Sequence, residues 1–178
     1  MKATGIVRRI DDLGRVVIPK EIRRTMRIRE GDPLEIYTEK DGEGIFKKYS
    51  PIGELGDFAA NYVETLAKAS GHGACITDRD NIIAVSGIPK KELMEKPISS
   101  ELENVLNDKT VLSSSSGKTI SVMEGNDKYS AGVVVPIISE GDTIGSVLFI
   151  MNEGEQLSEV ESKLAESAAG FLGKHMEG

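Results

Sequence analysis

The chain has 178 residues, a net charge of −7 and a mean hydropathy of −0.21. It contains no stretch of 18 apolar residues and no signal-peptide-like apolar region, so we expect a soluble, cytoplasmic protein. A single cysteine excludes an internal disulfide, and an aromatic content of 4% without Trp argues against a site that stacks a planar ligand.

The first 29 residues are basic although the chain as a whole is acidic. They hold nine Lys or Arg against three Asp or Glu, a local charge of +6, and the remaining 149 residues sum to −13. Seven of the nine bases are Arg, whose planar guanidinium matches phosphate geometry. This asymmetry indicates a polyanionic partner that meets one end of the chain. The alternative is a solvated basic face that binds nothing.

The basic residues are interleaved with a regular pattern of secondary structure. A short strand is expected over residues 6–9 and a second over residues 16–18, joined by a turn at residues 11–14. Pro19 suits the first turn of a helix with its body over residues 21–26, which Gly31 is expected to stop. A second hairpin follows, with strands at Leu34–Thr38 and Ile45–Lys48 and a turn at Asp41 and Gly42.

The stretch LGRVVIPKEIRR, residues 13–24, closely resembles the AbrB family of bacterial transition-state transcription regulators. The resemblance covers about the first 50 residues. It implies a swapped-hairpin dimer that binds double-stranded DNA, and it places the family's DNA-contacting arginines on Arg8, Arg15, Arg23 and Arg24. About 50 residues with so few large apolar side chains form a poor core alone, so burial between two chains is expected independently.

A second domain is expected from residue 54 to residue 178, after a break where the charge changes sign. Residues 1–50 carry 12 bases and 9 acids, whereas residues 51–178 carry 10 and 20. Apolar periodicity predicts the following elements: a helix over 55–69, strands at 74–77 and 82–86, helices at 91–95 and 101–107, strands at 119–123, 129–138 and 143–151, and a helix over 158–175.

The segment VVVPIISEGDTIGSVLFI, residues 133–150, resembles the central hairpin of GAF and related PAS folds. The expected fold class is therefore α+β, with an AbrB-like domain over 1–53 and a GAF-like regulatory and oligomerisation domain over 54–178. The resemblance implies a pocket between the sheet and its cover, for which residues 90–116 are the candidate. Whether this domain binds an unidentified small molecule or serves only for dimerisation is left open.

No catalytic or metal site is predicted, and no cofactor. Cys75 lies in an apolar strand and is expected to be buried and inert. His72 and His175 lack neighbours at metal-ligand spacing, and His72 is expected to cap a helix end. The Asp78 to Asp80 triplet lacks the glycine and glutamate of an EF-hand loop, so a solvated turn is expected.

The resemblance of the two domains together implies a non-enzymatic transcription regulator, activator or repressor, of a sporulation-type developmental programme. Its heads would dimerise on DNA, and helices 55–69 and 160–175 of the GAF-like halves would pair between chains, unless both helices only cover their own sheet. Such pairing gives a homo-oligomer, which is the expected tetramer if heads and tails have different partners, or a closed dimer if they share one. One alternative is a MazE-type antitoxin, which shares the swapped-hairpin head but typically carries a disordered toxin-wrapping tail. The other is a small-molecule sensor that does not bind DNA.

Overall fold

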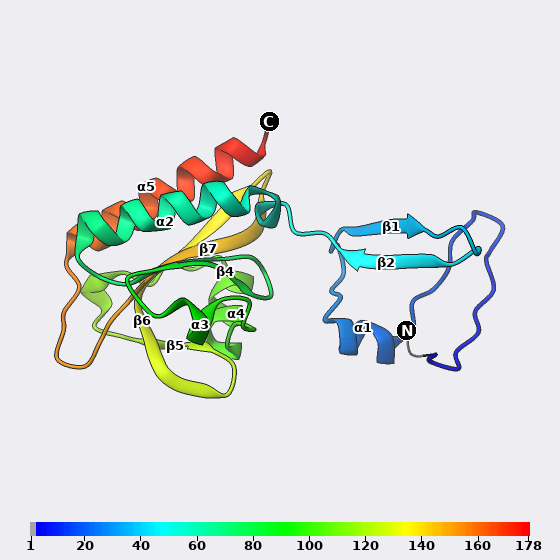
Figure 1. Ribbon diagram of the computed structural model, residues 1–178, viewed down its shortest axis with the longest axis horizontal. Coiled ribbons are helices and arrows are strands. Elements are labelled where there is room, and N and C mark those ends of the chain that lie inside the picture. Colours follow the sequence, from blue (N-terminus) through cyan, green and yellow to red (C-terminus); the bar gives the residue numbers. More distant parts are fainter. Residues whose placement is uncertain (1–2) are drawn as a thin grey trace. The chain divides into compact units, whose positions relative to one another are not determined.

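The computed structural model describes residues 3–178. The chain forms two compact units, and the boundary between them in the sequence lies between Tyr49 and Ser50 (Figure 1). The first unit, up to Tyr49, is called the head. The second, Ser50–Gly178, is called the C-terminal domain. The boundary predicted from the sequence, after residue 53, lies four residues further along the chain.

The head consists of one short helix and one hairpin. Helix α1 spans Lys20–Met26, and strand β1, Leu34–Thr38, pairs antiparallel with β2, Gly44–Lys48. Gly42 takes a φ of 84° in the connecting turn, which glycine adopts without a Cβ clash. The hairpin therefore has the strands and the turn that the sequence predicted.

Helix α1 ends at Met26, so the expectation that Gly31 stops it is wrong. Arg27 takes a left-handed conformation, with φ 53°, and its backbone N–H donates to the carbonyl oxygens of Arg23 and Arg24. The Nζ of Lys48 donates to the carbonyl oxygen of Arg27 at 2.7 Å, which holds the helix end against β2. The helix thus ends at the left-handed Arg27, well before Gly31, and Lys48 ties this end to β2.

Residues 3–10 and 15–18 form no strand in the single chain, although two strands were expected there. A strand needs a neighbour to satisfy its backbone donors and acceptors. Next to the turn, the N–H of Asp11 donates to the carbonyl oxygen of Arg15 at 2.9 Å, and this backbone hydrogen bond links the ends of the two segments. The turn predicted at residues 11–14 does form between them.

The C-terminal domain is built on a five-stranded antiparallel sheet in the order β4-β3-β7-β6-β5. Its strands are β3, Ala74–Thr77; β4, Ile82–Ser86; β5, Ile120–Met123; β6, Asn126–Ser139; and β7, Asp142–Ile150. Its helices are α2, Gly56–Ser70; α3, Lys90–Leu93; α4, Ser100–Asp108; and α5, Glu159–Met176, with 3-10 turns at Ile52–Leu55 and Ser114–Ser116. No helix in residues 3–178 has the length and apolar character needed to cross a membrane.

The sheet separates two apolar layers, and α2 and α5 lie side by side on one face of it (Figure 1). Alternate residues of β7 face opposite layers: Val147 and Phe149 pack towards α2 and α5, whereas Leu148 and Ile150 pack towards α3 and α4. This two-sided burial explains why the strand appears in the sequence as a continuous apolar run.

Residues 95–99, here called the closing segment, cover both open edges of the sheet. The N–H of Glu95 donates to the carbonyl oxygen of Ile82 in edge strand β4 at 2.8 Å. The N–H of Ser99 donates to the carbonyl oxygen of Val122 in the opposite edge strand, β5, at 3.0 Å. Because an uncovered edge is a template for unwanted strand pairing, the segment protects both edges and encloses the α4 side of the core.

Candidate nucleic-acid interface

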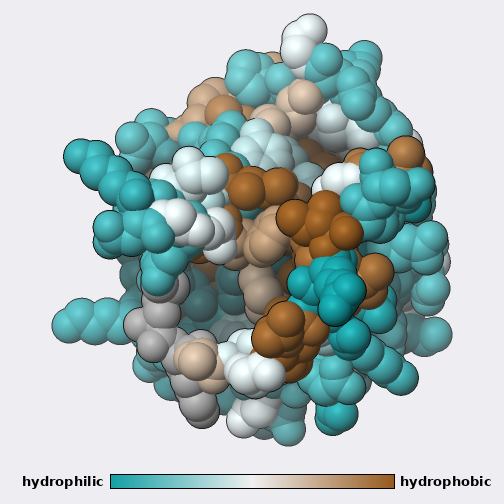
Figure 2. Space-filling view, turned by 90° about the vertical axis from the view of Figure 1, so that its right-hand side faces the viewer, coloured by the Kyte–Doolittle hydropathy of each residue, from teal (hydrophilic) through white to brown (hydrophobic). Residues whose placement is uncertain are grey.

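The head exposes most of its apolar side chains in the single chain. Pro19 is the one buried residue among residues 3–49. The exposed large apolar residues of the head are Ile6, Val7, Ile10, Leu13, Val16, Val17, Ile36, Tyr37 and Phe46, with Val7 reaching 88% exposure. Figure 2 faces the side that lies at the right in Figure 1, and it shows hydrophobic side chains at the surface next to hydrophilic ones. Soluble monomers seldom leave so much apolar surface uncovered, so the head lacks a core of its own.

All four arginines predicted to contact DNA are exposed. Arg8 precedes the turn at residues 11–14 and Arg15 follows it, whereas Arg23 and Arg24 lie in the last turn of α1. Within residues 3–178, Arg8, Arg23 and Arg24 form no ion pair, so their guanidinium groups are available to an outside anion. Among the described residues, no hydrogen bond or ion pair links the four arginines into one cluster.

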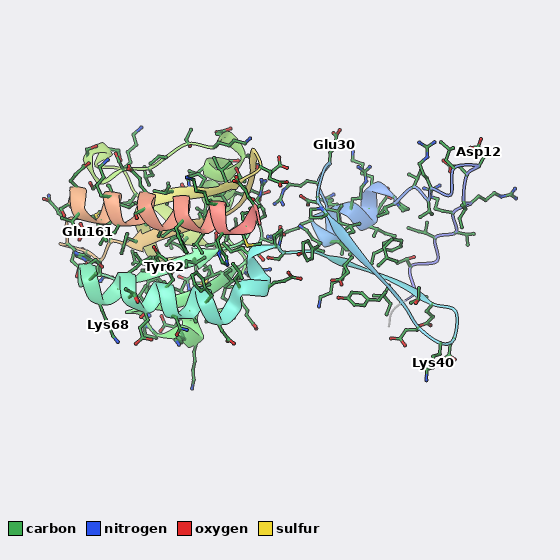
Figure 3. The ribbon with its side chains drawn as sticks, turned by 90° about the horizontal axis from the view of Figure 1, so that it is seen from above. Asp12, Glu30, Lys40, Tyr62, Lys68 and Glu161 are labelled. Atoms are coloured by element: carbon green, nitrogen blue, oxygen red, sulfur yellow. The ribbon has the colours of Figure 1, made fainter. Side chains whose placement is uncertain are left out.

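Arg15 has a partner in its own turn. The Nε of Arg15 lies 2.8 Å from Oδ2 of Asp11, and the Oδ1 of Asp11 accepts the backbone N–H groups of Leu13 at 3.0 Å and Arg15 at 2.8 Å. The backbone N–H of Arg15, and then its side chain, lower the pKa of Asp11 from its ordinary value. Asp12 lies in the same turn (Figure 3). The sequence predicted the turn, but not this ion pair.

Two other bases of the head serve its internal structure. Oδ2 of Asp32 lies 3.8 Å from Nη1 of Arg29 and 3.4 Å from Nζ of Lys48. The same oxygen accepts the backbone N–H of Arg29 at 2.9 Å. These contacts join the segment after α1 to β2. Net basic charge alone therefore overstates the number of cations that face outward.

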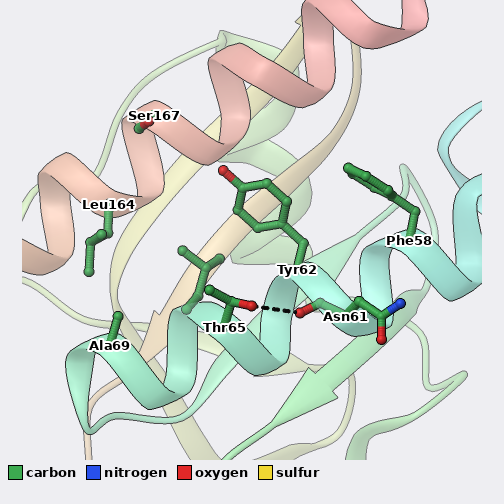
Figure 4. A pocket seen from close by; sticks show the side chains of 8 residues that line it. Phe58, Asn61, Tyr62, Thr65, Ala69, Leu164 and Ser167 are labelled. Atoms are coloured by element: carbon green, nitrogen blue, oxygen red, sulfur yellow. Dashed lines mark hydrogen bonds between the residues drawn. The ribbon is translucent and has the colours of Figure 1, made fainter.

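The C-terminal domain exposes an aromatic cluster on α2 and α5. The ring of Phe58 lies 6.0 Å from those of Tyr62 and Phe171 and 5.6 Å from that of His175, with the last two pairs stacked. Phe171 is 48% exposed. Next to it, a groove of about 450 Å³ runs between the two helices (Figure 4). Its lining consists of Phe58, Asn61, Tyr62, Thr65, Leu66, Ala69, Leu164 and Ser167.

Cys75 is fully buried, and burial raises the pKa of its thiol to about 12. The expectation of a buried cysteine is confirmed, and a thiol that stays protonated at neutral pH is a poor nucleophile.

The expectation that His72 caps a helix end is wrong. Its Nδ1 lies 3.3 Å from Oε2 of Glu155 and its Nε2 lies 3.7 Å from Oε1 of Glu161, so the ring joins the start of β3 to the start of α5. Glu161 also belongs to a capping box with Ser158, which fixes the first turn of α5.

The side chain of Asp78 holds the turn that contains the Asp78 to Asp80 triplet. Oδ1 of Asp78 accepts the N–H groups of Asp80 and Asn81, both at 2.7 Å. Within residues 3–178, no group of three His, Cys, Asp or Glu side chains is arranged to hold a metal ion.

Similarity to known proteins agrees with this division into two units. A family model described as "Stage V sporulation protein T C-terminal, transcription factor" matches residues 54–177. Over 178 residues the chain is 54% identical to stage V sporulation protein T of Bacillus subtilis (strain 168), with 99% of both chains covered. The chain belongs to the stage V sporulation protein T family.

Each unit of this family member also resembles proteins outside the family. A model described as "Antidote-toxin recognition MazE, bacterial antitoxin" matches residues 7–51. The transition state regulatory protein AbrB of Bacillus subtilis is 63% identical over 63 residues, which are 32% of this chain and 65% of that protein. The predicted AbrB-like head is thereby confirmed.

A structural likeness supports the assignment of the C-terminal domain. The crystal structure of the GAF domain from Acinetobacter phosphoenolpyruvate-protein phosphotransferase superposes with a TM-score of 0.55 at 15% identity, covering 68% of this chain and 81% of that one. At this identity the likeness shows the fold alone, and it confirms a GAF-like C-terminal domain in the stage V sporulation protein T family member.

Proposed function

We propose that this chain is a transcription regulator of a sporulation-type developmental programme, acting as activator or repressor. It binds double-stranded DNA through Arg8, Arg15, Arg23 and Arg24 of a dimeric head. The assignment is supported by similarity along the whole chain to stage V sporulation protein T and by the AbrB-like head. A regulator of this kind acts in the cytoplasm, and we expect no catalytic activity.

The observation that carries the proposal is the exposed apolar surface of the head beside its exposed arginines. Residues 3–10 and 15–18 lack strand partners in the single chain, and their side chains Val7 and Val17 lie in solvent. A second copy supplies both the missing partners and the missing core if the two chains interleave. Two heads then present eight arginines on one assembly, which suits a polyanion such as duplex DNA.

The exposed aromatic cluster on α2 and α5 supports a second contact between copies. Phe58 and Phe171 face solvent in the single chain although they stack on each other, and the groove beside them accepts apolar side chains. Two such helix pairs form a four-helix contact. Heads and C-terminal domains that pair with different partners give a tetramer, and pairing with the same partner gives a closed dimer.

Two other functions fit part of the chain. A MazE-type antitoxin accounts for the head, but residues 54–178 fold into a domain instead of a toxin-wrapping tail. A small-molecule sensor accounts for the GAF-like fold alone. On the α4 side of the sheet, Leu102, Leu106 and Leu148 pack together in the core. Modulation of DNA binding by such a ligand is part of the proposal, with the ligand unidentified.

The salt dependence of DNA binding tests the proposed interface. If all eight arginines of a dimer neutralise phosphates, the logarithm of the association constant falls with the logarithm of salt concentration with a slope of about −7. The slope is about −5 if the two copies of Arg15 contact bases instead. Arg23→Ala removes two contacts per dimer and flattens the slope by about two units. Fluorescence anisotropy with a labelled duplex between 50 and 200 mM salt, on the order of the physiological range, measures both quantities.

Lys40→Ala is the matched control, because Lys40 is an exposed cation in the β1–β2 turn outside the proposed contact set (Figure 3). It should leave the slope close to that of the unmodified chain. Binding that does not respond to salt, or equal flattening by both substitutions, would contradict the interface. Recovery of a toxin, instead of DNA, on the immobilised full chain would favour the antitoxin.

A further inference from the structure

Asp11 makes two kinds of contact in the turn between Arg8 and Arg15. One carboxylate oxygen, Oδ1, accepts the backbone N–H groups of Leu13 and Arg15 and so shapes the turn. The other, Oδ2, accepts the side-chain Nε–H of Arg15 at 2.8 Å. The carboxylate is therefore fixed by the backbone and in turn fixes a guanidinium, although the Arg15 side chain is 70% exposed.

Because Asp11 contacts Arg15 through Nε, the edge of the guanidinium that carries the two terminal nitrogens is open. Asp11 takes Nε, and within the described residues the two terminal nitrogens of Arg15 have no hydrogen-bond partner. Those two nitrogens form the planar fork that donates to O6 and N7 of guanine or to two phosphate oxygens. An exposed arginine normally samples many rotamers, and the Nε contact reduces that freedom before DNA is bound.

The same carboxylate is unfavourable for general attraction to DNA. A negative charge next to a DNA-contacting arginine repels the polyanion, and the hydrogen bonds from Arg15 lower the pKa of Asp11, so it stays charged at neutral pH. A head that only needed positive charge would bind better without it. Besides shaping the turn, Asp11 offsets this repulsion through the orientation that it gives to Arg15.

We propose that Asp11 is a positioning residue that aims the Arg15 fork at base edges, raising sequence discrimination while lowering sequence-independent affinity. The inference rests on the proposed function, since it requires that Arg15 contacts DNA. A merely structural role in the turn would not change specific and non-specific binding in opposite directions.

Asp11→Asn separates the two contacts. The amide oxygen of Asn still accepts the backbone N–H groups of Leu13 and Arg15, but the amide nitrogen is a donor and cannot accept Nε–H. The experiment uses the full chain with two duplexes: one enriched from a random-sequence pool by the unmodified protein, and a scrambled duplex of the same composition. Asp11→Asn should strengthen binding to the scrambled duplex and lower the ratio of specific to non-specific affinity by roughly three- to tenfold, part of what one arginine–guanine pair supplies.

Asp12→Asn is the matched control, since it removes the same charge from the same turn and, within residues 3–178, Asp12 has no ion pair or hydrogen bond. It should strengthen binding to both duplexes about equally and leave the ratio unchanged. Asp11→Glu is a second variant, which keeps the charge but displaces the carboxylate. Asp11→Glu should lower the ratio of specific to non-specific affinity while leaving the non-specific affinity unchanged. It tests the positioning role of Asp11 if Asp11→Asn fails to fold.

Arg15→Ala distinguishes failure of this inference from failure of the proposed function. If Arg15→Ala binds both duplexes as well as the unmodified chain, Arg15 is not a contact, and both proposals are wrong at this residue. If Arg15→Ala weakens binding but the Asn variants at 11 and 12 change the ratio equally, only the positioning role is overturned. Enrichment of no duplex from the pool also overturns it. Loss of the Asp11→Asn effect in the Arg15→Ala background supports it.

Discussion

At the scale of single residues, the cations of the head differ in what they contact. Arg29 and Lys48 are held by Asp32 and stabilise the junction of α1 with β2. Arg15 is held by Asp11 through one nitrogen, whereas Arg23 is exposed and forms no ion pair within residues 3–178. Exposed ion pairs add little stability, so the pair in the turn is better understood through orientation than through folding energy.

Cys75 gives a prediction about pH. Its pKa is raised from 9.0 to about 12 by burial, so the unfolded chain releases the thiol proton at a lower pH than the folded chain. The stabilisation is fully present below pH 9 and is lost as pH rises towards 12. Between pH 8 and about pH 10.5 the free energy of unfolding should therefore fall more in the unmodified protein than in Cys75→Ala, as measured by urea denaturation. Parallel decreases in the two proteins would show that Cys75 does not contribute.

At the scale of elements, α5 presents two different faces. Ala168 and Leu172 are buried against the sheet, whereas Val160 and Phe171 are exposed. Gly173 allows the helix to approach closely, because a Cβ at this position would lie 2.2 Å from the carbonyl oxygen of Ile138 in β6. A Cβ at Gly170, less than one turn earlier, would meet nothing within 4 Å.

These two glycines form a matched pair for mutation. Gly173→Ala should lower the free energy of unfolding by about 1–3 kcal/mol, because the backbone of Ile138 cannot move aside as a side chain could. Gly170→Ala should raise it by up to about 1 kcal/mol, because alanine has the better helix propensity and space is available. Thermal and urea denaturation of the full chain measure both. Equal effects would mean that the close approach of α5 to β6 does not limit the substitution.

At the scale of the whole molecule, charge is divided between the two units. Residues 1–50 carry a net +3 and residues 51–178 a net −10. An acidic C-terminal domain should repel DNA, so we expect phosphate contact to be confined to the head. The contribution we expect of the C-terminal domain to affinity is indirect, because linking two heads through a second interface raises their effective concentration on DNA without adding a contact.

Phe171→Asp tests this second interface. The charge should disrupt pairing of α2 and α5 between copies, giving a folded, smaller assembly with weaker DNA binding, measured by light scattering and anisotropy. Val111→Asp is the control, since Val111 is also exposed but lies after α4, away from the aromatic cluster. If Phe171→Asp unfolds the domain while Val111→Asp does not, Phe171 belongs to the core of its own chain and the interface is wrong.

The sequence by itself determined most of the elements of the C-terminal domain. Strands β3 and β4 and the bounds of α2 and α5 agree with their apolar periodicity to within about two residues, because that periodicity records which face is buried. Motif similarity determined the AbrB-like character of the head and the candidate arginines.

Contacts between residues distant in the sequence were decided only by the tertiary structure. Lys48 contacts the end of α1, and His72 lies between two carboxylates. The closing segment forms hydrogen bonds to both edge strands of the sheet. Whether residues 3–18 form strands also depends on a neighbour, since strands are stabilised by their partners and not by their own sequence. Local pattern determines which face of a segment is apolar, whereas only the folded chain determines what that face and the backbone beside it meet.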